Sequence, residues 1–194
     1  VHSRFSSSAP LSQSLVAGFG TPPIVPPTPN IPAPAPTLIR DLDGLPVFVF
    51  QTETDVVLSN GAERADGPWY REWEITGSAH ADAFIVTQGE NARELTSFIC
   101  GPEGTTVPIN AGPQTWAIRA ALRHMNRWVA TGIAPPSGER IERDGPFIRR
   151  DATTGIALGG IRLPDIEVPT LTLSGERGAG GNLFCFLFGK SDPW

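Results

Sequence analysis

The sequence lacks the long apolar runs and basic clusters that mark membrane proteins and nucleic-acid-binding proteins. A membrane-spanning helix needs roughly 18 apolar residues in a row, and the longest apolar runs, Val47–Phe50 and Leu183–Phe188, are only strand-sized. Lysine occurs once, at Lys190, the arginines are scattered, and the formal net charge is −5. We therefore expect neither a membrane span nor a nucleic-acid partner.

Cysteine is also scarce. The two cysteines, Cys100 and Cys185, lie too far apart in sequence to suggest a metal site by their spacing. They either form one disulfide in an oxidising compartment or remain two buried thiols, and the sequence leaves both readings open. Together with the missing initiator methionine at Val1, the pair points weakly to a secreted or periplasmic protein. The first residue indicates a processed chain or a piece of a longer one.

The 194 residues are enough for one domain with a hydrophobic core, and 40% of them are hydrophobic, which excludes a wholly disordered chain. The 20 prolines and 21 glycines predict much irregular backbone. We assign residues 1–40 to a Ser- and Pro-rich irregular segment and residues 41–194 to the ordered part. The proline run at Thr21–Thr37 reads as a surface connector or a cap over a pocket; a ligand for an aromatic groove is the alternative.

Two strands are predicted near the start of the ordered part. Val47–Phe50 is a short, continuous apolar run, typical of a parallel strand that is covered on both faces. The segment Trp69–Thr76 instead alternates, as expected for a strand nearer the edge of a sheet. One face carries Trp69, Arg71, Trp73 and Ile75, and the other carries Tyr70, Glu72 and Glu74.

The clearest helix is predicted over Pro113–Thr131, with Gly132 just beyond its end. We expect His124 to be structural and the Arg row of this helix to face solvent. The apolar stripe that should bury this helix is formed by Ile118, Leu122, Met125 and Val129. Four tryptophans are expected in the core rather than at a substrate platform: Trp69, Trp73, Trp116 and Trp128. Farther on, Gly160–Pro164 and Val168–Leu173 read as edge segments or a wrapping tail.

Two loops carry the candidate chemistry. Asp55 lies five residues beyond Phe50, and His80 lies four beyond Thr76. Ligands of open α/β sheets sit beyond the carboxyl ends of the strands, where a carboxylate and an imidazole on neighbouring strands can meet. The carboxylate would accept the Nδ1 proton and leave Nε2 as a general base.

Other readings of these residues stay open. Thr54-Asp55 would also serve as a helix cap, and Glu53 competes with Asp55 for the role of the acid. Asp82 lies close to His80 but would more naturally cap the helix that follows.

No candidate nucleophile accompanies this pair. A hydrolase elbow needs Gly-x-Ser-x-Gly between a strand and a helix, because its strained turn requires small neighbours. No serine of the sequence has glycine at both of these positions.

The sequence nevertheless resembles a poorly characterised family of α/β-hydrolase-domain proteins, presumed serine hydrolases. The resemblance covers essentially the whole chain, in order, and corresponds to the C-terminal portion of the family. It implies Asp55 as the acid of a triad and His80 as its base, with the serine upstream of this chain. The segments that carry the resemblance are Val1–Arg4, Thr52–Val56, Trp73–Asp82 and Ala157–Arg162.

We therefore expect the C-terminal part of a doubly wound α/β-hydrolase sheet, completed by an N-terminal part on a separate chain. The predicted reaction is hydrolysis of a small carboxylic ester through an acyl-enzyme, without metal or organic cofactor. Two alternatives remain: a non-catalytic binding subunit or remnant of a hydrolase, and a hydrolase that acts on an amide or a lactone. We also expect the chain to associate tightly with its other part, since a divided sheet exposes the edge of the strand Val47–Phe50.

Overall fold

The structure is a computed structural model that describes residues 38–40, 42, 44–58, 64–87, 97–100, 105–176 and 183–193. The predicted proline-rich segment, together with nearly all of residues 1–40, lies outside the described residues. In the described residues, no helix is long and apolar enough to cross a membrane.

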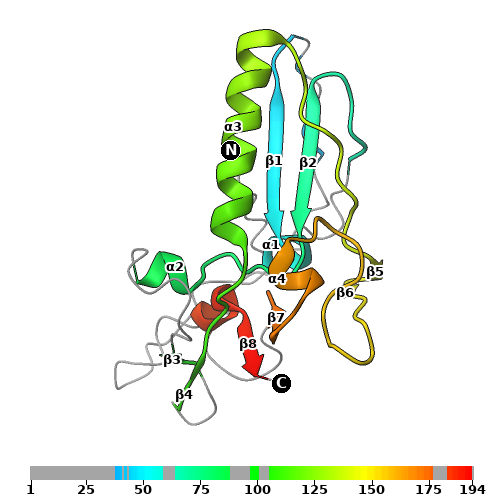
Figure 1. Ribbon diagram of the computed structural model, residues 1–194. Helices are drawn as coiled ribbons and strands as arrows, with labels where there is room; N and C mark the ends of the chain where they lie inside the picture. The colour runs from blue at the N-terminus through cyan, green and yellow to red at the C-terminus, as the bar shows by residue number, and fades with distance from the viewer. Residues whose placement is uncertain are drawn as a thin grey trace, which may run out of the picture.

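Two parallel strands form the centre of the fold, as their sequences predict. β1 (Val47–Thr52) pairs with β2 (Tyr70–Ile75) in a register that runs from Val47 opposite Tyr70 to Thr52 opposite Ile75. Both strands therefore end at the same edge, close to the short helix α1 (Figure 1). The elements in chain order are β1, α1 (Glu53–Leu58), β2, α2 (Ala83–Val86), β3 (Ser97–Ile99), β4 (Thr106–Pro108), α3 (Gln114–Thr131), β5 (Arg143–Asp144), β6 (Phe147–Ile148), α4 (Pro164–Glu167), β7 (Leu171–Ser174), the 3₁₀ helix η2 (Leu183–Phe188) and β8 (Lys190–Pro193).

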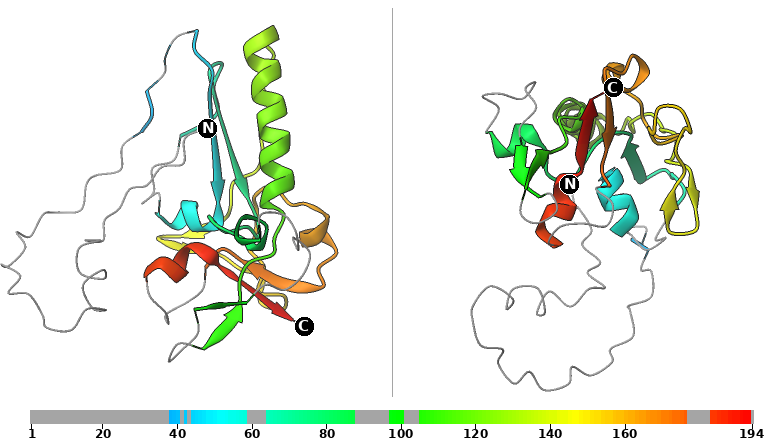
Figure 2. Two further views of the ribbon diagram at one scale, coloured as in Figure 1. Left: turned by 90° about the vertical axis from the view of Figure 1, so that its left-hand side faces the viewer. Right: turned by 90° about the horizontal axis from the view of Figure 1, so that it is seen from below.

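The long helix α3 stands alongside the two strands (Figures 1 and 2). It ends as predicted, with Gly132 in the left-handed conformation at φ +73°, which glycine adopts without steric cost. Its contact with the sheet differs from the predicted stripe, because Leu122 and Val129 are 46% and 66% exposed. Small alanines let the helix approach the sheet closely, and the core between them consists of Phe48, Phe50, Trp73, Ile75, Ala117, Ala121 and Trp128.

Two tryptophans of the predicted core, Trp73 and Trp128, are buried, but Trp116 is 53% exposed, so for this residue the prediction is wrong. The guanidinium of Arg119 lies 5.4 Å from the Trp116 ring centroid, a cation–π arrangement on the helix surface. His124 packs edge-on against Trp73, with ring centroids 5.4 Å apart. This contact supports the prediction that His124 has a structural role.

The polar face of β2 is buried as well, although its alternation suggested an edge strand. Glu72 and Glu74 are 1% and 2% exposed. The Arg140 guanidinium donates to the Glu72 carbonyl at 2.7 Å, and the Ile141 N–H donates to the Glu74 carboxylate at 2.7 Å. Burial raises the pKa of Glu74 to about 7, against the lowering effects of the Ile141 hydrogen bond and the Arg140 charge.

The C-terminal region wraps around the lower end of the sheet (Figure 2). Ile161 forms a parallel bridge with Ile75, so the segment Gly160–Pro164 does reach the sheet edge. β7 pairs antiparallel with β8. The strand-sized apolar run 183–188 forms the 3₁₀ helix η2 rather than a strand, and Cys185 and Phe188 in it are buried.

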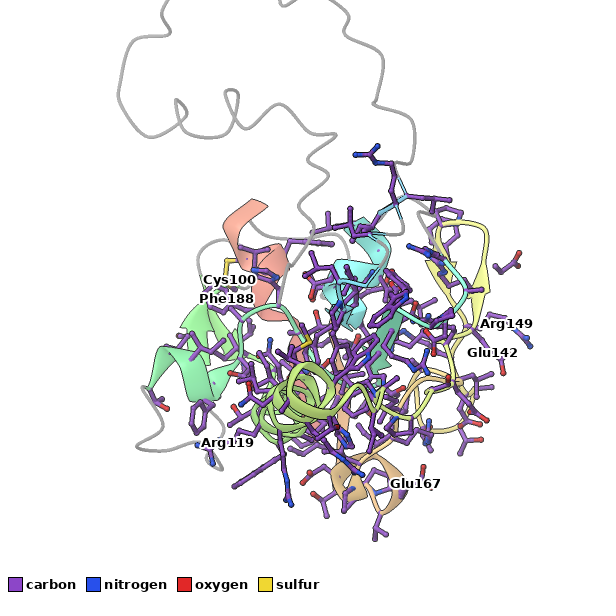
Figure 3. All side chains as sticks on the ribbon, turned by 90° about the horizontal axis from the view of Figure 1, so that it is seen from above. Cys100, Arg119, Glu142, Arg149, Glu167 and Phe188 are labelled. Carbon is purple, nitrogen blue, oxygen red and sulfur yellow. A yellow bond between two sulfur atoms is a disulfide. The ribbon has the colours of Figure 1, made fainter. Side chains whose placement is uncertain are left out.

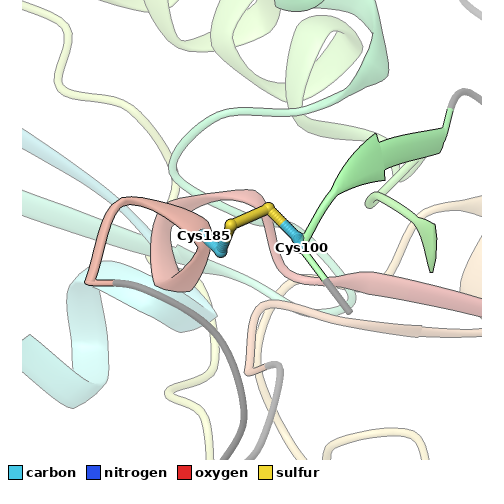
Figure 4. Close-up of a disulfide and its surroundings, with 2 residues drawn as sticks. All are labelled: Cys100 and Cys185. Carbon is cyan, nitrogen blue, oxygen red and sulfur yellow. A yellow bond between two sulfur atoms is a disulfide. The ribbon is translucent and has the colours of Figure 1, made fainter. Parts of the chain in front are cut away.

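The two cysteines are joined. A disulfide links Cys100 with Cys185, across 85 positions of sequence (Figure 4). It connects the segment after β3 to η2, and Cys100 lies beside Phe188 in the view from above (Figure 3). The surrounding core cluster also contains Ala83 and Ile109. Of the two readings that the sequence leaves open, the structure has the disulfide.

Candidate active site at the strand ends

The structure brings the two predicted site residues, Asp55 and His80, into contact. Asp55 lies in the first turn of α1, directly after β1, and His80 lies in the loop between β2 and α2. Because β1 and β2 are adjacent and parallel, both side chains emerge at the same edge of the sheet. Asp55 Oδ1 is 2.7 Å from His80 Nδ1, and the side chains are 8% and 23% exposed.

The carboxylate of Asp55 is held by its own helix start. Its second oxygen, Oδ2, accepts from the main-chain N–H of Thr52 at 3.0 Å and from the Thr52 hydroxyl at 2.8 Å. Thr52 Oγ1 in turn lies 3.3 Å from the main-chain nitrogen of Asp55. This reciprocal pattern is a capping box, in which residues three apart satisfy each other's free main-chain donors. Asp55 thus caps the helix with one oxygen and contacts His80 with the other; its capping partner is Thr52, not Thr54.

His80 is fixed through its main chain. Its N–H donates to the hydroxyl of Thr54 at 3.2 Å, and its carbonyl accepts from the side-chain amide of Gln114 at 3.1 Å. The hydrogen bond to Asp55 raises the pKa of His80 above its usual 6.5, while burial acts in the opposite direction. With the Nδ1 proton directed at Asp55, the basic nitrogen of the neutral ring is Nε2.

The two other acids near the site, Glu53 and Asp82, are hydrogen-bonded to other partners than His80. The Glu53 carboxylate is fully buried and accepts from the main-chain N–H of Gly77 at 2.6 Å and from Arg150 Nη2 at 2.8 Å. Asp82 caps α2, because its side chain accepts from the main-chain N–H of Ile85 at 2.9 Å, as its position in sequence suggests.

The buried serines donate their hydroxyl protons to main-chain carbonyls. Ser78 donates to Ile75 at 2.7 Å, and Ser191 donates to Ile109 at 3.0 Å. Ser174 donates to the carbonyl of Glu176 at 3.0 Å. These roles are structural. Among the described residues, no group of three or more His, Cys, Asp or Glu side chains is arranged to hold a metal ion.

Several residues that shape this site are not among the sequence candidates. The capping box Thr52-x-x-Asp55 is readable from the sequence, because Thr followed three positions later by an acid is its signature. No local sequence pattern points to Gln114 or Arg150. Gln114 lies 34 positions from its partner His80, and Arg150 lies 97 positions from its partner Glu53.

The family of the chain follows from comparison with known protein families. The α/β-hydrolase domain family matches residues 1–194. The chain belongs to this family. Comparisons with curated proteins and with solved structures gave no match.

Proposed function

We propose that this chain supplies the acid and the base of a Ser-His-Asp triad that hydrolyses carboxylic esters through an acyl-enzyme. The observation that carries the proposal is the 2.7 Å contact between Asp55 Oδ1 and His80 Nδ1 at the carboxyl ends of two parallel strands. Membership of the α/β-hydrolase domain family supports it. The sequence contains no Gly-x-Ser-x-Gly elbow, so the serine belongs to a part outside this chain.

The mechanism assigns one task to each residue. The serine oxygen attacks the ester carbonyl carbon while His80 Nε2 takes the hydroxyl proton. His80 then gives that proton to the leaving alcohol oxygen as the tetrahedral intermediate collapses to the acyl-enzyme. Water repeats the sequence and releases the acid. Asp55 keeps the Nδ1 proton in place and stabilises the imidazolium at both stages.

The missing part is proposed to complete a doubly wound sheet at β1. Within the described residues β1 pairs with β2 alone, although Phe48, Val49 and Phe50 are all at most 5% exposed. A buried, apolar strand with one unpaired edge favours the addition of a further strand. The N-terminal part of the same hydrolase, on a separate chain, is the partner we propose. A folded, stable monomer of this chain in sedimentation would contradict it.

A second candidate function is that of a protein with the hydrolase fold but without catalytic activity. The missing nucleophile favours a binding subunit or a remnant of a hydrolase, whereas the intact Asp55–His80 contact favours catalysis. A hydrolase that acts on amides or lactones would use the same residues, so a substrate panel is needed to choose the bond.

Two histidine variants test the proposal in the native preparation. His80→Ala should lower kcat for p-nitrophenyl esters by about 10⁶-fold, because the general base is lost. His124→Ala, which removes the histidine that packs edge-on against Trp73, is the matched control and should retain turnover. Turnover by His80→Ala at the level of His124→Ala would refute the catalytic role, and inactivity of the unaltered protein toward every ester would favour the binding subunit.

A further inference from the structure

Glu53 is the most completely enclosed acid beside the site. It is 0% exposed and lies two positions before Asp55. Its Oε1 accepts from the main-chain N–H of Gly77 at 2.6 Å, and its Oε2 accepts from the N–H of Gly175 at 2.9 Å. Arg150 Nη2 lies 2.8 Å from the same Oε2. One carboxylate therefore joins the start of α1, the loop that leads to His80 and the end of β7.

We propose that the Glu53–Arg150 ion pair is a positioning device that sets the place of His80 relative to Asp55. The pair acts through the loop Gly77–His80 and does not touch a substrate. Its catalytic meaning rests on the proposed function, but its geometric effect on His80 exists whether or not the protein hydrolyses esters.

The loop Gly77–His80 is held at both ends by consecutive residues of α1. At its start, Glu53 accepts from the Gly77 N–H through its carboxylate and donates its own N–H to the Ser78 carbonyl at 3.2 Å. At its end, the Thr54 hydroxyl accepts from the His80 N–H at 3.2 Å. Asp55, the next residue, contacts the His80 ring. Three successive residues thus fix the main chain and the side chain of the histidine loop.

The end of β7 is the third member of this arrangement. The Thr54 hydroxyl donates to the Gly175 carbonyl at 2.8 Å, while the Gly175 N–H donates to Glu53. A Cβ atom on Gly175 would lie 2.4 Å from the Ser78 carbonyl oxygen and 2.5 Å from the Glu53 Cβ. The backbone at Gly175 therefore lies in close contact with both the loop Gly77–His80 and α1, and this close approach requires glycine.

Arg150 supplies the positive charge that this buried carboxylate needs. Burial lowers the pKa of Arg150, but the charges of Glu53 and Glu176 outweigh it and raise the pKa above its ordinary value. Arg150 Nη2 also lies 2.8 Å from Glu176, and Nη1 donates to the Gly155 carbonyl at 3.2 Å. Without Arg150, a charged carboxylate would remain uncompensated in the interior, which is strongly unfavourable.

The neighbouring arginine offers a matched control. Arg149 pairs with Glu142 at 2.6 Å, and their side chains are 56% and 46% exposed. Both residues lie at the periphery of the molecule (Figure 3). Exposed ion pairs of this kind contribute little to stability, so Arg149→Met removes an ion pair of the same chemistry without reaching the histidine loop.

The test is an NMR titration of His80 in the native preparation labelled with ¹⁵N-histidine. We expect Arg150→Met and Glu53→Gln both to lower the His80 pKa and to weaken the low-field Nδ1 proton signal, because the displaced loop lengthens the hydrogen bond between His80 and Asp55. The changes of charge alone would move the His80 pKa in opposite directions in the two variants. Arg149→Met should leave both unchanged. Thr54→Val should act like Arg150→Met, whereas Thr54→Ser, which keeps the hydroxyl, should restore the original titration. An Arg150→Met protein that folds and titrates like Arg149→Met would overturn the proposal.

The double variant Glu53→Gln, Arg150→Met removes the ion pair without leaving an uncompensated buried charge, so it keeps the proposal testable if the single ion-pair variants do not fold. In that case, a His80 titration of the double variant that is identical to that of Arg149→Met would overturn it. The titration requires no turnover, so it fails independently of the proposed function. Where turnover is measurable, Arg150→Met should lower kcat by about 10–100-fold with KM nearly unchanged, because a small displacement of the base affects the chemical step.

Discussion

Asp55 contacts His80 with one carboxylate oxygen and closes the first turn of its own helix with the other. Oδ1 lies 2.7 Å from His80 Nδ1, and Oδ2 accepts two hydrogen bonds from Thr52. The helix cap and the candidate acid, which are alternatives on sequence grounds, are thus two functions of one side chain. The cap fixes the rotation of the carboxylate, so the position of the oxygen that contacts the imidazole is set by the helix start.

Neutralising Asp55 should change the titration of His80. Asp55→Asn keeps the shape of the side chain but removes the charge, so we expect the His80 pKa to fall from its raised value. Because the folded-state pKa lies above 6.5, the pair stabilises the fold fully below pH 6.5 and loses this contribution as the pH rises through the folded-state pKa. NMR titration and urea unfolding across this range check both statements. An unchanged His80 pKa in Asp55→Asn would contradict the contact.

The cap itself is separable from the charge. Thr52→Ala removes the hydroxyl that pairs with Asp55 and should lower the free energy of unfolding by about 1 kcal/mol. Thr52→Ser retains the hydroxyl and is the control. Urea denaturation measures the difference, and equal stabilities of the two variants would show that the capping box contributes nothing.

The buried acid of β2, Glu74, predicts a second pH dependence of the free energy of unfolding. The folded-state pKa of Glu74 is about 7, above its ordinary 4.5, so the native state retains a proton that the unfolded chain releases. Stability from this group is present at low pH and declines as the pH rises from about 4.5 through about 7. Glu74→Gln cannot ionise and should gain about 2–3 kcal/mol over the unaltered protein at pH 8.

Thermal and urea unfolding between pH 5 and pH 8 measure this effect. Glu142→Gln is the control, because Glu142 is 46% exposed and pairs only at the surface. A Glu74→Gln protein that is less stable than the unaltered one at pH 8 would show that the charged carboxylate is needed for the contacts with Arg140 and Ile141.

The disulfide should contribute to stability through the long loop that it closes. Cys100 and Cys185 are 85 positions apart, and removing such a link costs about 2–5 kcal/mol. We expect the double variant Cys100→Ser, Cys185→Ser to unfold at correspondingly lower urea concentration. Intact mass after alkylation without reductant provides the direct check, and two alkylated thiols in the native protein would contradict the bond.

The central part of the fold was predictable because local patterns determine it. The apolar run of β1, the alternation of β2 and the glycine after α3 each depend on neighbours in sequence. The contact between Asp55 and His80 also follows from them, since two adjacent parallel strands bring their carboxyl ends together. The family resemblance adds the expected roles of Asp55 as the acid and His80 as the base.

The rest depends on tertiary contacts that leave no local pattern. The buried face of α3 is set by the alanines that approach Phe48 and Phe50, and so Leu122 and Val129 are exposed despite their spacing. The alternation of β2 gives no sign that Glu72 and Glu74 are buried, because the residue that contacts them, Arg140, lies some 70 positions later. Arg150 reaches Glu53 across 97 positions in the same way.

The most direct test of the account is fluorophosphonate labelling of the native preparation, followed by intact masses of every chain present. We expect a second chain that carries one probe adduct, while this chain stays unlabelled, and a loss of labelling in His80→Ala but not in His124→Ala. If this chain occurs alone and unlabelled, or if His80→Ala labels at the full rate, then Asp55 and His80 do not serve a serine nucleophile.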